Sequence, residues 1–504
     1  MRTSLSPLAW FSYVGQVGNL RRVGNPPAAQ STDAAQGRVP LGRRMPSCPT
    51  NSLAILLLCP LLLSAASYDV RTYGALGDAT TLDTAAIQRA IDAANAAGGG
   101  IVNFPAGRFL SGTLTLKSNV TLYLSPGSTL LGSRRIEDYN PKHLIYAQGV
   151  HNIAIEGGGT IDGQGDLFLD KDLKPLPRPS PLIEIWDSHG IRIQDVTILK
   201  APAWTIHPKN CDDVKIRGVS LLNNLRAINT DGIDIDSSRN VIVSDCHIEA
   251  GDDCIVLKTT NRGGAGPQAQ QPTENVTVAN SVLVSAASAL KLGTESFADF
   301  RHCAFSNCII RDSRTGIALL AKDGGAMEDI RFSNIEMTTL PKWGQGVEWP
   351  IEIDIDRRTT SSRLSRIRDV SFNGITIYTK GRVLVEGTPE SLIERVSFRD
   401  VLMRMGGYEK IDRVRKMTGG TAAPAAGLPD YGPTPAAMIF AYVRGLMLDG
   451  IVTVWPSDAA APAPDRAALF GDHLEDVLIA GFHGTASLPG ARAIRIQDSK
   501  DVKE

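Results

Sequence analysis

The sequence predicts an all-β chain wound into a right-handed parallel β-helix, a single-stranded solenoid with a short N-terminal capping helix. A nine-residue pattern, apolar-x-apolar-x-x-apolar-x-apolar after a polar start, recurs from residue 190 onward. Its spacing is mostly 23–35 residues, which is typical of stacked repeats. One amphipathic helical segment precedes the strand-rich region, where it could close the end of a solenoid core. A β-sandwich or propeller is the alternative, but a cluster of Trp-Asp dipeptides or hairpin turns is not seen.

Residues 45–66 match a signal peptide. A short apolar run at 52–63 follows a basic flank at 43–44 and ends in small residues at 64–66. The run is too short for a good membrane span. We therefore expect residues 1–44 to be a mis-called or disordered extension and the mature product to be secreted or periplasmic, without a membrane anchor. A genuine N-terminal tail followed by an anchor helix is the alternative.

Residues 83–97 are predicted to form the capping helix. Apolar residues at 87, 90, 91 and 94 repeat at helical spacing, and three glycines at 98–100 end the segment. Either Asp83 or Thr84 could cap its first turn.

Residues 67–500 are expected to form one β-helix catalytic domain. Period-2 alternation within each repeat predicts strands whose apolar side chains point inward. Cys246, Ser281 and Cys308 occupy the same repeat position and should stack in one interior ladder. Three long excursions interrupt the repeats, at residues 261–274, 339–366 and 404–440. Long loops on a rigid scaffold often line a functional groove, and the first two of these excursions follow the acidic motifs.

The composition is that of a soluble globular protein. The chain has 504 residues, a formal net charge of −1 and a sequence pI of about 6.7. These values give no electrostatic case for binding nucleic acid or a membrane surface. Five cysteines follow the signal, none with the CxxC spacing of a zinc site. Their odd number permits one or two disulfides without naming any, and we interpret most of them as buried thiols.

Two acidic motifs carry the candidate chemistry. Asn-Thr-Asp at 229–231 and Gly-Asp-Asp at 251–253 place Asp231 and Asp252 21 residues apart, about one lap of a coil. Both carboxylates should then lie on adjacent rungs, with Asp253 beside them. Crowding raises the pKa of one carboxyl while its neighbours stay ionised. That arrangement supplies the acid and the base that glycoside hydrolysis needs.

The acidic strand has two other interpretations when it is taken alone. Asp234 and Asp236 alternate with isoleucines, as the solvated face of a half-buried strand would. Together with Asp231 they could also supply oxygen ligands to calcium. The second motif, at the spacing of one lap, favours catalysis.

These motifs resemble those of glycoside hydrolase family 28, the polygalacturonase family of pectin-degrading enzymes. The resemblance covers roughly residues 68–490 and includes Gly-Gly-Thr-Ile-Asp-Gly-Gln-Gly at 158–165 and Pro-Ala-Trp-Thr-Ile-His-Pro at 202–208. It implies a secreted, monomeric hydrolase of α-linked pectic polysaccharide that acts by inverting single displacement, with no metal or other cofactor.

The resemblance also implies the roles of the three aspartates, whereas Lys258 and Lys291 are candidates because of their positions on the strands beside the acidic motifs. Asp252 would be the general acid, whereas Asp231 and Asp253 would hold and deprotonate the attacking water. The expected substrate-binding residues are Asn229, Lys258, Ser288, Lys291 and Lys322.

Two departures from the family pattern bear on the substrate. Ser288 stands in Ala-Ser-Ala where the family has Gly-His-Gly, and residues 316–325 lack the arginine of the family's Arg-x-Lys pair, leaving Lys322. A lone ammonium does not reproduce the bidentate contact of a guanidinium with a carboxylate. The alternatives are a rhamnogalacturonan hydrolase or rhamnosidase-type member of the family, a calcium-dependent polysaccharide lyase, and a non-catalytic carbohydrate-binding solenoid.

Overall fold

The structure is a computed structural model that describes residues 66–261, 271–341, 347–407, 436–456 and 464–504. The chain divides between Leu62 and Leu63 into two units, and all described residues belong to the second. The expected N-terminal extension and nearly all of the expected signal peptide lie outside the described residues. So do residues 262–270, 342–346 and 408–435 of the expected excursions. Within the described ranges, none of the helices has the length and apolar character needed to cross a membrane.

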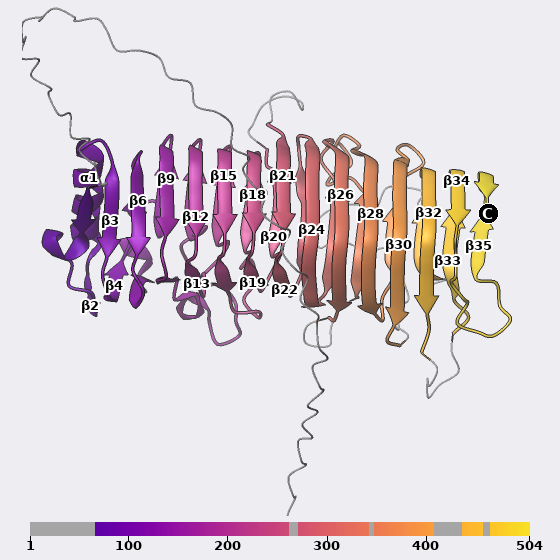
Figure 1. Ribbon diagram of the computed structural model, residues 1–504, viewed down its shortest axis with the longest axis horizontal. Coiled ribbons are helices and arrows are strands. Elements are labelled where there is room, and N and C mark those ends of the chain that lie inside the picture. The colour runs from indigo at the N-terminus through magenta and orange to yellow at the C-terminus, as the bar shows by residue number, and fades with distance from the viewer. Residues whose placement is uncertain (1–65, 262–270, 342–346, 408–435, 457–463) are drawn as a thin grey trace, which may run out of the picture. The chain divides into compact units, whose positions relative to one another are not determined.

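The described strands form two parallel sheets, one of 23 strands (sheet A) and one of 13 (sheet B). In sheet B, β14 (Ile206–Lys209) pairs in parallel with β11 (Ile183–Trp186) of the preceding lap and with β17 (Ile233–Asp236) of the next. Figure 1 shows successive laps lying side by side in chain order from α1 to β36. The predicted right-handed parallel β-helix is confirmed.

The bounds of the strands follow the laps. Sheet B contains β5 (Leu114–Thr115), β8 (Ile145–Gln148), β11, β14, β17, β20 (Ile255–Thr259), β23 (Ser288–Ser296), β25 (Thr315–Ala321), β27 (Trp349–Ile355), β29 (Val383–Glu386), β31 (Ala436–Ala441), β33 (Ala467–Asp472) and β35 (Ile494–Gln497). Sheet A contains β1 (Ser67–Asp69), β2 (Asp78–Leu82), β3 (Gly100–Phe104), β4 (Gly107–Ser111), β6 (Val120–Leu124), β7 (Ser128–Gly132), β9 (His151–Glu156), β10 (Thr160–Asp162), β12 (His189–Gln194), β13 (Thr197–Leu199), β15 (Asp212–Arg217), β16 (Ser220–Leu222), β18 (Arg239–Ser244), β19 (His247–Ala250), β21 (Thr273–Ala279), β22 (Val282–Ser285), β24 (Phe300–Ser313), β26 (Ala326–Thr339), β28 (Arg366–Thr379), β30 (Ile393–Met405), β32 (Val443–Val454), β34 (Glu475–Ala480) and β36 (Lys500–Lys503). Three short 3-10 helices lie at Val70–Tyr73, Ile136–Asp138 and Gly165–Phe168.

The nine-residue pattern bends between its two apolar pairs. Asp245, Asn280, Asn307 and Asn334 occupy that bend in successive laps, each with a φ between 52° and 58°. Asn and Asp tolerate this left-handed conformation better than other non-glycine residues. Each Asn side-chain amide donates to the oxygen of the residue below it, at 2.8–3.3 Å. The repeat therefore carries Asn or Asp at this bend because these residues accept the left-handed backbone and link neighbouring laps by hydrogen bonds.

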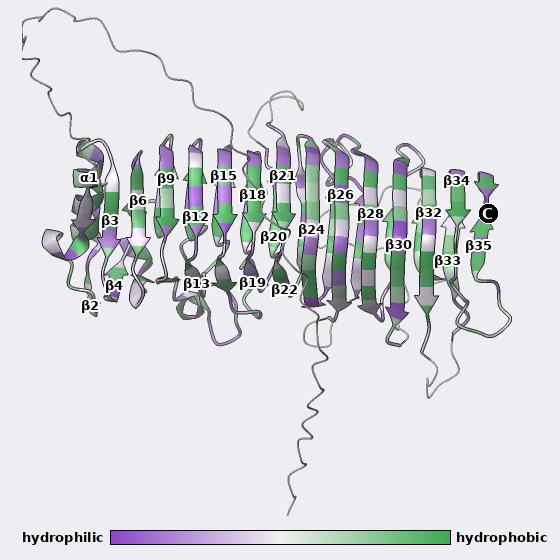
Figure 2. Cartoon of the chain, in the orientation of Figure 1, coloured by the Kyte–Doolittle hydropathy of each residue, from purple (hydrophilic) through white to green (hydrophobic). Residues whose placement is uncertain are grey.

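The interior is filled by ladders of equivalent side chains. Phe305, Phe332, Phe372 and Phe398 stack with ring centroids 4.5–5.0 Å apart, and all are buried. The strands in Figure 2 accordingly change between green and purple along their length, because alternate residues face the core and the solvent.

The predicted ladder of Cys246, Ser281 and Cys308 is confirmed. Their neighbours pair as His247 with Val282 and Val282 with Ile309, so the three residues share one register position. All five cysteines of the described residues are free and buried. The structure thus supports the interpretation of buried thiols.

The predicted capping helix is α1 (Thr84–Ala96), which buries the four expected apolar positions. Asp83 precedes the helix without capping it through its side chain. Its carboxylate instead accepts hydrogen bonds from the backbone of Leu76 (2.8 Å) and Gly77 (3.0 Å). The helix begins as expected, but this acid fixes a neighbouring turn.

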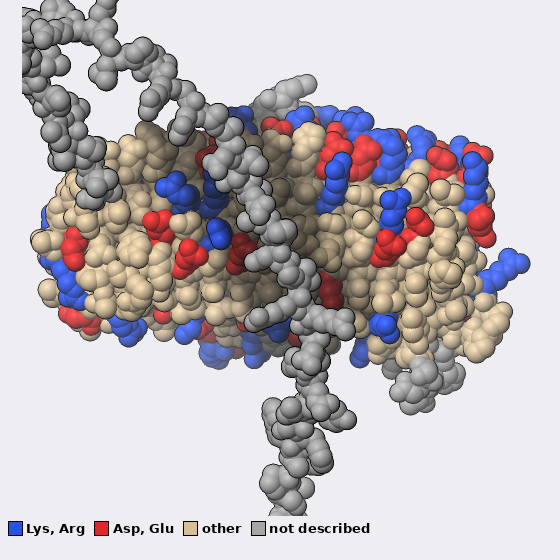
Figure 3. All heavy atoms as spheres, viewed as in Figure 1, with Lys and Arg blue, Asp and Glu red and all other residues tan. Residues whose placement is uncertain are grey.

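The expected excursion at 339–366 contains a strand of sheet B. Residues 349–355 form β27, which pairs with β25 and β29. The polar composition of this segment predicts a loop, but the side chains of its charged Glu352 and Asp354 are buried. On the face shown in Figure 3, basic and acidic side chains lie interspersed, in keeping with the net charge of −1.

Candidate active site

Asp231, Asp252 and Asp253 lie together where two laps enter sheet B. Asp231 precedes β17 by two residues and Asp253 precedes β20 by two, and the register pairs Ile233 with Ile255. Each of the three aspartates offers a carboxylate oxygen within 4.8 Å of the others. The parallel register therefore brings together the three side chains that the two motifs singled out.

A tight turn holds the two motifs against each other. The Thr230 hydroxyl donates to the carbonyl of Ala227 (2.8 Å) and accepts from the backbone of Gly251 (3.1 Å). A Cβ at Gly251 would collide with the Ala227 carbonyl oxygen. Only glycine fits between the laps here, which explains why the second motif begins with this residue.

Lys291 determines the state of Asp253. Its ammonium lies 2.6 Å from Asp253 Oδ2, while the backbone N–H of Ser288 donates to Oδ1 (3.1 Å). Burial by itself would raise the pKa of Asp253, but the Lys291 charge and these hydrogen bonds outweigh it and hold the pKa below its usual value. Asp253 is therefore the ionised member of the trio.

Asp252 is shifted in the opposite direction. Burial and the adjacent Asp253 charge raise its pKa to about 6. The backbone N–H of Asn229 donates weakly to its Oδ2 (3.3 Å), which opposes the rise only in part. Asp252 thus keeps a proton at a pH where Asp253 has lost its own.

Asp231 and Asp253 are the two most buried carboxyls of the trio. Asp231 is 3% exposed, and its Oδ1 has no hydrogen-bond partner among the described residues. Burial and the nearby Asp234 raise its pKa well above the usual value. An oxygen left without a partner in such a position is suited to accept a hydrogen bond from a bound water.

Lys258 stands on the same face as the trio. Its ammonium lies 2.9 Å from Asp234, 3.9 Å from Asp231 and 3.6 Å from the centroid of the Trp204 ring. Burial alone would lower its pKa, but the surrounding carboxylates raise it. Lys258 is therefore a fixed positive charge that balances part of the negative charge of the aspartates.

Four of the five expected substrate-binding residues join this cluster. Lys258 and Lys291 do so through their ammonium groups, whereas Asn229 and Ser288 do so through their backbone N–H groups. Lys322 forms a different ion pair, with Asp356 at 3.5 Å, and both side chains are buried. The structure does not show Lys322 contacting the trio.

A buried chain of charges was not predicted as part of the site. His207 Nδ1 lies 2.7 Å from Glu184 and its Nε2 lies 3.5 Å from Asp236. Burial would lower the pKa of His207, but the two carboxylates outweigh this and raise it to about 9. The signal in the sequence is positional only in part, since Glu184 and His207 pair in register on successive strands, whereas Asp236 pairs with Lys209.

The calcium set of Asp231, Asp234 and Asp236 is not what the structure assembles. Asp234 pairs with Lys258, and Asp236 accepts from the hydroxyl of Thr260 (2.6 Å) as well as facing His207. The carboxylates that could converge on a cation are instead those of Asp231, Asp252 and Asp253.

An aromatic groove of about 500 Å³ lies on the earlier laps, and its Trp204 contacts Lys258, whose ammonium lies 3.9 Å from Asp231. Trp204, which carries Lys258 on its ring, lines the groove together with Tyr146 and Trp186. The Lys209 ammonium lies 5.0 Å from the Trp186 ring centroid. Exposed aromatic faces of this kind suit the apolar face of a sugar ring.

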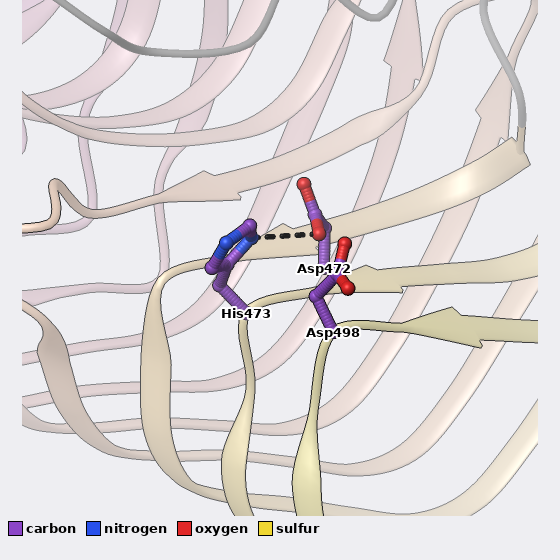
Figure 4. Close-up of side chains that lie close together, drawn as sticks. All are labelled: Asp472, His473 and Asp498. Atoms are coloured by element: carbon purple, nitrogen blue, oxygen red, sulfur yellow. Dashed lines mark hydrogen bonds and ion pairs between the residues drawn. The ribbon is translucent and has the colours of Figure 1, made fainter.

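A second acidic group lies in the last laps of the coil. Asp472, His473 and Asp498 also bring their ligand atoms within 4.8 Å of one another. Figure 4 shows these three side chains grouped together. His473 Nδ1 is paired with Asp472 (2.8 Å), and its ring stacks on Tyr442. His473 and Asp498 are exposed, so we regard this group as a hydrogen-bonded cluster near the surface.

Comparison with known proteins identifies the family. The family model described as "Glycosyl hydrolases family 28" matches residues 99–423. A probable polygalacturonase of Vitis vinifera is 27% identical over 75% of this chain and 84% of its own length. An endo-polygalacturonase of Pectobacterium carotovorum subsp. carotovorum is 27% identical over 66% of this chain and 86% of its own length.

Solved structures share the fold. A Yersinia enterocolitica family 28 exopolygalacturonase superimposes with a TM-score of 0.61 at 19% identity, covering 84% of this chain and 79% of that one. An exopolygalacturonase from Thermotoga maritima gives a TM-score of 0.59 at 23% identity, covering 68% and 87% respectively. With the family model spanning more than half of the sequence, the chain belongs to family 28 of the glycosyl hydrolases and is a glycoside hydrolase.

Proposed function

We propose that this chain hydrolyses α-linked galacturonate-containing pectic polysaccharide, with Asp252 as general acid and Asp253 as general base. The observation that carries the proposal is the pair of opposite pKa shifts on two adjacent carboxyls, raised to about 6 for Asp252 and lowered for Asp253. An acid and a base that coexist at one pH are what the reaction requires. The polygalacturonase names of the relatives supply the substrate class.

The steps of the reaction follow from these assignments. Asp252 donates its proton to the glycosidic oxygen as the bond from the anomeric carbon to that oxygen breaks. A water held by the free Oδ1 of Asp231 attacks the same carbon, and its proton passes to Asp253. The proton gained by Asp253 returns to Asp252 through solvent after the products leave.

Two observations bear differently on the stereochemistry. Carboxylate oxygens within 4.8 Å of each other are closer than the roughly 6.5–9.5 Å between the two carboxyl groups of most inverting glycosidases. However, the unpartnered Oδ1 of Asp231 offers a place for a water beside Asp253, and a water activated by a carboxylate is what an inverting displacement uses. We therefore propose inversion, which nuclear magnetic resonance of the first-formed anomer tests directly.

The aromatic groove is proposed to bind a sugar on the side of the earlier laps. Trp186 is 36% exposed and would stack on the ring, while Lys209 remains within reach of its substituents. The variant W186A should raise KM for long oligogalacturonides and leave kcat nearly unchanged, because stacking there acts in both ground and transition states. An equal loss for the shortest cleaved substrate would contradict this subsite.

A calcium-dependent lyase is the second candidate, since Asp231, Asp252 and Asp253 could also hold a cation. The proposed hydrolase should keep its activity in a chelator and release saturated products. Loss of activity on chelation, with ultraviolet-absorbing unsaturated products, would identify a lyase instead.

We further propose that the protein is exported through the signal at 45–66 and acts as a monomer. N-terminal sequencing of the mature protein from the culture medium or periplasm should begin near residue 67. Light scattering of that product should give the mass of one chain.

A further inference from the structure

Arg178 lies on a long segment between β10 and β11 that projects from the entrance to sheet B. This segment reaches across one intervening lap to the turn that precedes β17. Asn224 of that turn donates to Asp166 (2.8 Å), and Arg178 Nη2 donates to the carbonyl of Ile228 (3.4 Å). An upstream segment thereby forms part of the wall beside Asp231.

The Arg178 guanidinium has no carboxylate partner among the described residues. Its Nη1 is buried without a hydrogen-bond partner there, and burial lowers its pKa with no nearby acid to raise it. Arg358 differs in this respect, since its guanidinium binds Asp323 through two nitrogens at 2.8 Å each. A buried donor with nothing to bind costs free energy unless a ligand satisfies it.

One peptide group connects Arg178 to the trio. The carbonyl of Ile228 accepts from Arg178, and the N–H on the other side of the same peptide, that of Asn229, donates to Asp252 Oδ2 (3.3 Å). Ser180 and Pro181, further along the same segment, line the aromatic groove. Arg178 is therefore linked to the proposed acid through one peptide group and to the groove through its own segment.

The cations closest to the aspartates are already neutralised. Lys258 is paired with Asp234 and Lys291 with Asp253. A polymer carrying a carboxylate on each sugar would meet net negative charge at the trio unless another cation faced it. No acid is paired with Arg178 among the described residues, so its charge is available to such a polymer.

We propose that Arg178 binds the carboxylate of the uronate sugar next to the cleaved bond. It thereby supplies, from an upstream segment, the guanidinium that residues 316–325 lack. The planar fork of arginine matches a carboxylate with two parallel hydrogen bonds, which a neutral sugar or a methyl ester does not offer. This assignment rests on the proposed function and narrows its substrate to chains with free uronate groups.

The test compares wild type, R178Q and R178K on polygalacturonate and on the same polymer after full methyl esterification. R178Q should lower kcat/KM on polygalacturonate by about 10- to 100-fold, the range for one hydrogen-bonded charged group, with most of the loss in KM. Its kcat/KM on the ester should match wild type, and R178K should fall between the two. R192Q, which removes an exposed arginine from β12, serves as the control and should match wild type on both polymers.

Equal losses of R178Q on both polymers, or no loss on either, would overturn the inference while leaving the hydrolase intact. If wild type cleaves neither polymer, the proposed function fails and calorimetry decides the inference separately. Trigalacturonate should then bind D252N at least tenfold more tightly than D252N/R178Q. Equal affinity, or no binding to either protein, would remove Arg178 from substrate recognition.

Discussion

The ion pair between Lys291 and Asp253 offers the sharpest perturbation of the site. Replacing Lys291 by Met keeps most of the side-chain volume and removes the charge that lies 2.6 Å from the carboxylate. Coulomb's law at an effective dielectric of about 20 gives an attraction of roughly 6 kcal/mol at that distance. Part of this attraction offsets the cost of burying both ions, and losing one partner of a buried pair typically costs about 3–5 kcal/mol.

A change of about 3 kcal/mol corresponds to a rise of about 2 units in the pKa of Asp253. The wild-type pKa is held below the usual value, so in K291M it should rise above that value, toward the range of Asp252. The base would then be protonated over much of the pH range in which the wild type works. Because Lys291 also lowers the pKa of Asp252, that pKa should rise as well.

The assay is the pH dependence of kcat/KM on polygalacturonate. This pH profile should be bell-shaped, with an acidic limb set by the base Asp253 and an alkaline limb set by the acid Asp252. Both limbs should move to higher pH in K291M, the acidic limb by about 2 units. At pH 5 the activity should fall by about 10-fold, since a carboxyl whose pKa approaches that of Asp252, about 6, is only about one-tenth ionised there. An acidic limb that stays in place, with a uniform loss at every pH, would refute the assignment of Asp253 as the base held ionised by Lys291.

Three further predictions concern the buried charges and the core. The raised pKa of His207, about 9 against roughly 6.5 when unfolded, should stabilise the fold by about 3 kcal/mol below pH 6.5 and lose this contribution as pH rises toward 9. The Tm of the wild type should therefore fall over that interval, whereas the Tm of H207Q should start lower and change little. In F332A the loss of a ring stacked on both sides should lower the free energy of unfolding by about 3–5 kcal/mol in urea titrations. A loss below 1 kcal/mol would show that the ladder collapses to fill the space. The depressed pKa of Asp253 contributes stability above its unfolded value, near pH 4, and this is lost as pH falls further, so wild type and K291M should converge in Tm at acidic pH.

The sequence pattern was sufficient to predict the β-helix and to bring the three aspartates of the trio together. Repeats at lap spacing placed Cys246, Ser281 and Cys308 in one ladder, as the strand register shows. The same logic brought Asp231 and Asp252 together, because parallel pairing converts a separation of one lap into contact between neighbours. Pattern reasoning works here because each lap repeats the same geometry.

The rest depended on distances that no pattern contains. The polar composition of residues 339–366 predicts a loop, whereas residues 349–355 form a strand in which the charged Glu352 and Asp354 are buried. The opposite shifts of Asp252 and Asp253 arise from burial and from the 2.6 Å contact of Lys291. Arg178 lies in a segment outside the repeats, where periodicity gives no position at all.

The most direct test of the account measures reducing ends released from polygalacturonate by D252N beside wild type and D498N. Asp498 belongs to the exposed group in the last laps, so D498N applies the same chemical change away from the trio. Wild type and D498N should release sugar at equal rates, and D252N should fall by at least about 100-fold with an unchanged circular dichroism spectrum. Activity of D252N within twofold of wild type would contradict the claim that this carboxyl donates the proton.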